Sequence, residues 1–179
     1  MKNIPNILTL LRVILIPFFI YYFIEDNLMV AFILFMVASI TDYFDGYLAR
    51  KYNVISNFGK IMDPLADKLL VLSALALLSF GKHGYLSAGI FVIITLREVI
   101  ITVLRDAYKK KKIYLAANDW GKVKTVTQMV GLTLSLFILA LNINLAAYSL
   151  YLNIYFWIVA FVTILSGLSY LKNIKELLK

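Results

Sequence analysis

Four aspartates, Asp42, Asp45, Asp63 and Asp67, lie where two apolar stretches of the sequence meet. If both stretches are helices, spacings of three and four residues place each pair of acids on one helical face. Carboxylates beside apolar segments need a counter-charge, and oxygen ligands suit hard divalent cations. The pattern therefore predicts a site for Mg²⁺ or Mn²⁺, which commonly act in pairs on phosphate groups.

Two glycines, an alanine and an arginine accompany the acids. Gly46 and Gly59 lack a Cβ, so a ligand or an opposing backbone can come close beside the carboxylates. Ala49 keeps the same face small, and Arg50 is able to hold a phosphate with its forked donors. A solvated acidic loop is the simpler interpretation, but it gives no reason for acids at helical spacing. We therefore interpret the junction as a metal-dependent phosphate site.

The junction has the pattern D-x-x-D-G-x-x-A-R, followed after eight residues by G-x-x-x-D-x-x-x-D. This pattern resembles the signature of the CDP-alcohol phosphotransferase family, integral membrane enzymes of phospholipid synthesis. The resemblance implies transfer of a phosphatidyl group from CDP-diacylglycerol to an alcohol, with release of CMP. It implies that the four aspartates hold two divalent ions, Mg or Mn, and that Asp67 is the catalytic base. It further implies a CDP-binding site formed by Asp42, Gly46, Ala49, Arg50 and Gly59.

The composition is that of a membrane protein. Of the 179 residues, 62% are hydrophobic and 16% are charged, which is far from the balance of a soluble domain. The absence of cysteine excludes disulfides and thiolate metal sites. We attribute the net charge of +8 to cytoplasmic flanks and to contacts with anionic lipid headgroups, and expect no nucleic acid partner.

Six apolar segments, each close to the ~20 residues that a bilayer requires, predict a polytopic all-α membrane protein. We expect a single domain over residues 1–179, with spans at 7–24, 28–48, 61–80, 85–104, 123–141 and 148–170. If the N-terminus is cytoplasmic, the loops on that side hold nearly all lysines and arginines, and only Lys82 falls outside. Both termini and the aspartate junction are therefore predicted to be cytoplasmic, and the resemblance implies a bacterial plasma membrane.

The N-terminal stretch contains Asn6, Thr9 and Arg12. It predicts a short amphipathic helix at the membrane interface before the first span. The three polar residues fit simple interfacial anchoring and substrate contact equally well. The start N-I-P-N-x-L-T-x-x-R resembles that of the bacterial family members that use glycerol 3-phosphate, and this resemblance favours substrate contact.

Two arginines in the fourth segment, Arg97 and Arg105, are eight residues apart. This spacing corresponds to roughly 12 Å along a helix and nearly to one face, so both are candidates to line a polar cavity. Alternatively, Arg97 pairs with a signature carboxylate and Arg105 reaches the headgroups. Glu98 is interpreted as a partner that orients an arginine or a metal ligand.

Two lysines, Lys122 and Lys124, open the fifth segment. Residues two apart do not share a helical face, so at least one of them is predicted to point away from any pocket. An acceptor that carries a phosphate requires a cationic pocket. The candidate acceptor-phosphate ligands are Arg97, Arg105, Lys122 and Lys124.

The resemblance favours glycerol 3-phosphate as the acceptor and implies a homodimer among membrane lipids. Other acceptors remain open, including phosphatidylglycerol, as in a cardiolipin synthase, and serine or inositol phosphate. An ion-coupled transporter is a different class, but it predicts charges near the middle of the bilayer and two related halves. An inactive lipid-binding scaffold would not require the intact acidic motif.

Overall fold

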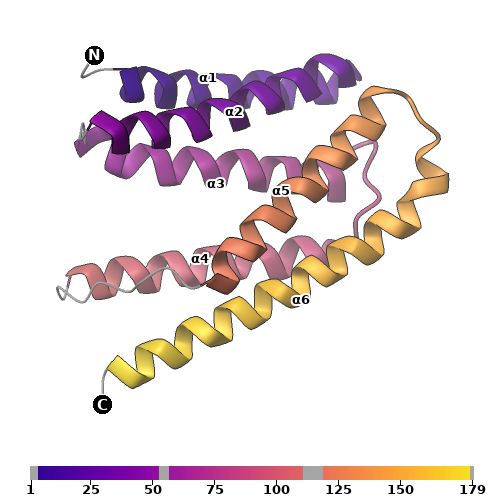
Figure 1. Ribbon diagram of the computed structural model, residues 1–179. Helices are drawn as coiled ribbons and strands as arrows, with labels where there is room; N and C mark the ends of the chain where they lie inside the picture. The colour runs from indigo at the N-terminus through magenta and orange to yellow at the C-terminus, as the bar shows by residue number, and fades with distance from the viewer. Residues whose placement is uncertain (1–3, 53–56, 111–118, 178–179) are drawn as a thin grey trace. The chain divides into compact units, whose positions relative to one another are not determined.

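The computed structural model describes the backbone of residues 4–52, 57–110 and 119–177. Side chains are described for residues 7–42, 62–108, 120–144 and 147–172. The described chain is all-α, without strands, which confirms the predicted fold class (Figure 1). Its helices are α1 (Ile4–Ile24), α2 (Leu28–Tyr52), α3 (Asn57–Phe80), α4 (Ala88–Lys110), α5 (Asp119–Ala140) and α6 (Leu145–Leu177).

Each predicted apolar segment falls on one of these helices, with its ends moved by a few residues. The two halves of the acidic signature lie in α2 and α3, so the acids do occur at helical spacing. One expectation is wrong in form. Helix α1 runs without a break from Ile4 to Ile24, so the N-terminal amphipathic stretch forms its first turns and is not a separate interfacial helix.

Among the described residues, three helical stretches are long and apolar enough to cross a membrane: Ile7–Ile24, Trp120–Ala140 and Ala147–Lys172. A shorter apolar stretch, Leu28–Asp42, belongs to α2. Charged residues interrupt the other two helices, for example Asp67 in α3 and Arg97 in α4. The presence of apolar helices is therefore confirmed, and the full set of six spans stays a prediction.

The chain divides into two compact units, which we describe separately. The first comprises Met1–Gly84 and Leu132–Leu145, and the second comprises Tyr85–Gly131 and Ala146–Lys179. Helix α5 contributes its C-terminal part to the first unit and its N-terminal part to the second. A single domain over residues 1–179 stays a prediction.

In the first unit, α1 lies beside α2 and α3 and contacts both (Figure 1). Helix α1 has two distinct faces. The buried face carries Thr9, Arg12, Ile16, Phe19 and Phe23. The exposed face carries Ile7, Leu10, Ile14, Phe18 and Tyr21. Two polar residues, Thr9 and Arg12, are buried while large apolar side chains are exposed, and this arrangement suits a helix that faces lipid.

The helix ends at the turns after α1 and α5 are alike. Asp26 and Asn142 adopt left-handed backbone conformations, with φ of 60° and 51°. The backbone hydrogen bonds around them are those of a Schellman motif, which satisfies the last carbonyls of a helix. The Asp26 carboxylate also contacts the turn after α3, through Lys82 and through His83 Nε2 at 2.6 Å. These contacts join the two turns at one end of the first unit.

In the second unit, α6 packs closely on the N-terminal part of α5. A Cβ at Gly131 would lie 2.6 Å from Cε1 of the Tyr155 ring, so only glycine permits this approach. The Tyr155 hydroxyl donates to the Thr127 carbonyl at 2.7 Å. Gly131 is thus used for packing within the unit.

Candidate active site

Helix α2 brings Asp42 to the buried side of the first unit. Ala31, Phe35 and Ala38 form a fully buried stripe on α2, and the Phe35 ring lies 5.7 Å from that of Phe19 on α1. Asp42 comes four residues after Ala38 and continues this stripe by one turn. The carboxylate is therefore carried to the side of α2 that faces α1.

Helix α3 does the same for the second half of the signature. Its buried stripe includes Ala66, Leu70 and Ala74, and Asp63 precedes Ala66 by three residues. Asp67 follows Asp63 by four residues, so both carboxylates project from neighbouring positions of the helix. Both side chains are half-buried.

Two side chains of α1 contact these acids. Arg12 Nη1 lies 2.6 Å from Asp42 Oδ1, and the Thr9 hydroxyl donates to Asp63 Oδ1. Arg12 and Thr9 are only 0% and 1% exposed. The structure thus places both residues against signature aspartates of α2 and α3.

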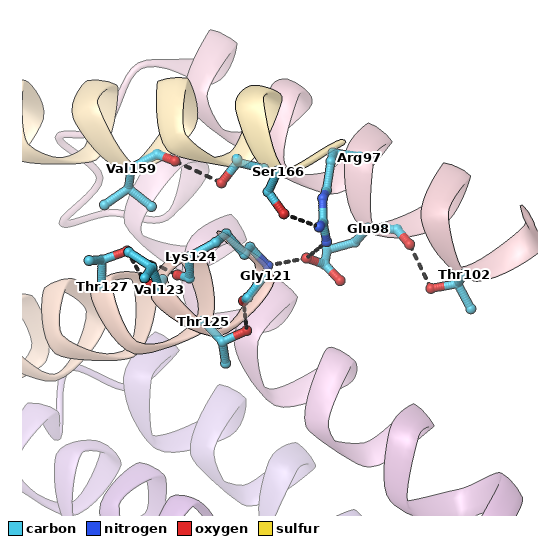
Figure 2. A network of polar contacts seen from close by, with 11 residues as sticks. Arg97, Glu98, Thr102, Gly121, Val123, Lys124, Thr125, Thr127, Val159 and Ser166 are labelled. Atoms are coloured by element: carbon cyan, nitrogen blue, oxygen red, sulfur yellow. Dashed lines mark hydrogen bonds and ion pairs between the residues drawn. The ribbon is translucent and has the colours of Figure 1, made fainter. Parts of the chain in front are cut away.

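A second group of polar side chains lies in the second unit, where α4, α5 and α6 meet (Figure 2). Glu98 Oε1 accepts a hydrogen bond from Lys124 Nζ and lies 3.3 Å from Arg97 Nη1. Arg97 Nη2 donates to Ser166 Oγ at 2.6 Å. Two candidate phosphate ligands, Arg97 and Lys124, therefore share one carboxylate.

The other two candidates, Arg105 and Lys122, differ in their surroundings. Arg105 Nε is 3.4 Å from the Tyr170 hydroxyl, and its guanidinium lies 5.7 Å from the centre of that ring. Lys122 is exposed, whereas Lys124 is buried, with only 5% of its surface exposed. The two lysines thus occupy different faces of α5, and Lys124 is the one that joins Glu98.

The matched family model, described as CDP-alcohol phosphatidyltransferase, covers residues 2–165. The chain belongs to the CDP-alcohol phosphatidyltransferase family. A relative from Rickettsia felis is 37% identical over 178 residues, which are 98% of this chain and 97% of the relative. A relative from Haemophilus influenzae is 38% identical and covers 97% of this chain and 94% of its own length. Both are named CDP-diacylglycerol–glycerol-3-phosphate 3-phosphatidyltransferase.

Family membership confirms the resemblance expected from the signature. Several residues of the CDP-alcohol phosphatidyltransferase signature lie outside the described side chains, and their roles stay predictions. They are Asp45, Gly46, Ala49, Arg50 and Gly59, together with Asn6 of the N-terminal stretch.

The donor chemistry of the signature fits a hard divalent cation, because carboxylate oxygens are the ligands that Mg²⁺ and Mn²⁺ prefer. Asp42, Asp63 and Asp67 are described at the adjoining ends of α2 and α3. Within the described side chains, no three acids or histidines gather at one point. The fourth aspartate, Asp45, lies beyond those side chains, so a two-metal arrangement stays a prediction.

The sequence interpretation missed three polar residues of the second unit of this CDP-alcohol phosphatidyltransferase. Ser166 accepts a hydrogen bond from Arg97, and Tyr170 contacts Arg105. Gln128 lies one turn after Lys124, is 1% exposed, and its amide finds no partner among the described residues. An amide in the middle of an apolar helix is itself a signal of a special role.

Proposed function

We propose that this chain transfers the phosphatidyl group of CDP-diacylglycerol to glycerol 3-phosphate, giving phosphatidylglycerophosphate and CMP. One observation carries the proposal: relatives that match nearly the whole chain bear the name of this reaction. The intact eight-residue signature supports it, since its acids suit diphosphate chemistry.

In the proposed reaction, the acceptor hydroxyl forms a bond to the phosphorus of the phosphatidyl group, and the bond from that phosphorus to CMP breaks. Asp67 accepts the hydroxyl proton. Nearby cations keep a carboxylate ionised and therefore weakly basic, so acidification of the hydroxyl by a bound metal, or positioning of the hydroxyl, would ease this proton transfer. CDP is held by Asp42 and by the small residues and arginine of the signature: Gly46, Ala49, Arg50 and Gly59.

Two divalent ions, Mg or Mn, held by Asp42, Asp45, Asp63 and Asp67, would stabilise the charge that develops on the leaving CMP. The protein contributes the acids and their orientation. The contacts from α1 to Asp42 and Asp63 bear on that orientation, because a carboxylate held by a neighbour presents its remaining oxygen in a defined direction.

Arg97 and Lys124 are the proposed ligands of the acceptor phosphate, with Arg105 as a third. The proposal is supported by two buried or half-buried cations, Arg97 and Lys124, that both contact the carboxylate of Glu98. A phosphate is a suitable partner for such a group. Lys122 is the weakest of the four candidates because its side chain is exposed.

We also propose that six spans hold the protein in the bacterial plasma membrane, with both termini and the active site on the cytoplasmic side. The distribution of lysines and arginines supports this orientation. A homodimer among membrane lipids is proposed from family resemblance alone. Several small residues available for an interface, such as Gly131 and Ser166, are occupied by contacts within the second unit.

The proposal is tested by CMP release from purified protein in detergent with CDP-diacylglycerol, glycerol 3-phosphate and either Mg²⁺ or Mn²⁺. We expect metal-dependent release that requires glycerol 3-phosphate and disappears in Asp67→Asn. CMP release only with phosphatidylglycerol, serine or inositol phosphate would show that this compound, and not glycerol 3-phosphate, is the acceptor. No release with any acceptor would contradict the enzymatic function and favour a transporter or scaffold.

A further inference from the structure

We propose that Thr9 and Arg12 are positioning residues of the metal site, and that they orient Asp63 and Asp42 across the junction of α2 and α3. This inference rests on the proposed metal-dependent function. It assigns to the two α1 residues a role different from the substrate contact that their sequence context favours.

Thr9 and Arg12 are both buried. Arg12 is 0% exposed and Thr9 is 1% exposed, on a helix whose opposite face is apolar. A buried guanidinium or hydroxyl is costly unless it is paired, and each of these has an aspartate as its partner. A side chain without exposed surface is poorly placed to meet a substrate, whereas it is well placed to hold a neighbouring side chain.

Thr9 and Arg12 connect α1 to both α2 and α3. Thr9 and Arg12 are three residues apart and lie on one face of α1. Their partners lie on two different helices, Asp63 on α3 and Asp42 on α2. One turn of α1 therefore contacts both halves of the signature, and it sets the position of one aspartate relative to the other.

The two contacts leave carboxylate oxygens of Asp42 and Asp63 for a cation. A carboxylate has two oxygens, and a hydrogen bond to one of them leaves the other for a cation. Thr9 and Arg12 each contact an Oδ1 atom, of Asp63 and Asp42 respectively. The Arg12 charge also offsets the repulsion between neighbouring carboxylates when no cation is bound. Both contacts match the way outer groups orient metal ligands in proteins.

The test measures Mn²⁺ binding to the full chain in detergent by electron paramagnetic resonance, beside CMP release. Thr9→Val removes the hydroxyl and keeps the shape of the side chain. We expect it to raise the Kd for Mn²⁺ about tenfold, as loss of an outer contact to a metal ligand commonly does. Thr9→Ser should restore binding, because it restores the hydroxyl. At saturating Mn²⁺, the KM for glycerol 3-phosphate should not change in either variant.

Thr41→Val is the matched control, because the Thr41 hydroxyl donates a 2.8 Å hydrogen bond to the Ala38 carbonyl of its own helix. It makes the same chemical change one residue from Asp42, and we expect wild-type Mn²⁺ affinity. Arg12→Lys keeps the positive charge but loses the planar guanidinium with its several donors. We expect it to weaken Mn²⁺ binding as well. If Arg12→Lys fails to fold, the comparison of Thr9→Val with Thr9→Ser still tests whether α1 orients the metal ligands.

Wild-type Mn²⁺ affinity in Thr9→Val would overturn the inference. A raised KM for either substrate with unchanged Mn²⁺ affinity would also overturn it and would make Thr9 a substrate contact. The proposed function is tested separately. Wild-type protein that binds Mn²⁺ but releases no CMP would contradict the proposed reaction. The comparison of Mn²⁺ affinities would still test the role of α1.

Discussion

Lys124 of α5 and Glu98 of α4 form an ion pair whose side chains are only 6% and 14% exposed. The same carboxylate lies 3.3 Å from Arg97 Nη1, so Arg97 and Lys124 both contact it. In such a setting, removal of one partner leaves uncompensated charge and is strongly destabilising. A phosphate group would bring further negative charge to these two cations.

Glu98→Gln should lower the thermal stability of the protein, because it leaves Arg97 and Lys124 without their shared acid. Breaking a buried pair in this way typically costs about 3 kcal/mol. We expect glycerol 3-phosphate to raise the melting temperature of the variant more than that of the wild type. Tryptophan fluorescence during heating in detergent measures both effects. Glu25→Gln serves as the control, because it removes the same charge at an exposed turn. Equal melting temperatures for the wild type and Glu98→Gln would contradict the prediction.

Ser166→Ala should weaken acceptor binding, because Ser166 Oγ accepts a 2.6 Å hydrogen bond that orients Arg97. A hydrogen bond to a charged group contributes about 1.5 kcal/mol or more, which corresponds to about a tenfold change in binding. We expect the KM for glycerol 3-phosphate to rise by this factor, with little change for CDP-diacylglycerol. Thr163→Val is the control, since the Thr163 hydroxyl bonds to the Val159 carbonyl of its own helix. An equal rise in the control would indicate a general packing effect.

Arg105→Ala should raise the KM for glycerol 3-phosphate much more than the KM for CDP-diacylglycerol. Equal effects on both would remove Arg105 from the acceptor site. Tyr170 contacts Arg105 through its hydroxyl and its ring face. Tyr170→Phe keeps the ring and should therefore act more weakly than Tyr170→Ala, which also loses the cation–π contact of about 0.5–1 kcal/mol.

Asp26→Asn should weaken the link between the turns after α1 and α3. Hydrogen bonds from Lys82 and then His83 lower the pKa of Asp26 below its ordinary value of 3.8. A carboxylate with a lowered folded-state pKa stabilises the fold above its unfolded pKa, and it loses this contribution as the pH falls through the folded pKa. Asparagine tolerates the left-handed conformation of this position, so the variant isolates the charge.

The measurement for Asp26→Asn is the melting temperature as a function of pH. We expect a small deficit in the variant at neutral pH, because the pair is exposed, and no deficit well below pH 3.8. A deficit that stays constant down to that range would show that the effect comes from the turn conformation and not from the charge.

Single cysteines should report the orientation in the membrane, because the natural sequence contains none. Glu25→Cys should react with an impermeant maleimide in intact cells, and Lys122→Cys only after the membrane is opened. Both positions are exposed, so access by the reagent depends on the side of the membrane. Reversed labelling would contradict the cytoplasmic N-terminus, and labelling of both in intact cells would contradict the predicted number of spans.

The sequence by itself determined the helical segments, the acidic signature and the family. Helical period and apolar segment length are local properties, so the pattern from Asp42 to Asp67 was sufficient to place the acids on α2 and α3. The same local information misjudged the start of α1, because an amphipathic first turn and an apolar continuation are compatible with one unbroken helix.

Only the tertiary structure decided which side chains meet. Arg12 and Asp42 are 30 residues apart, as the numbering shows, and Arg97 and Ser166 are separated by 69. Such pairs depend on how neighbouring helices are rotated and shifted against each other, which no local pattern records. The same register buries Lys124 and exposes Lys122, a choice that the two-residue spacing left open.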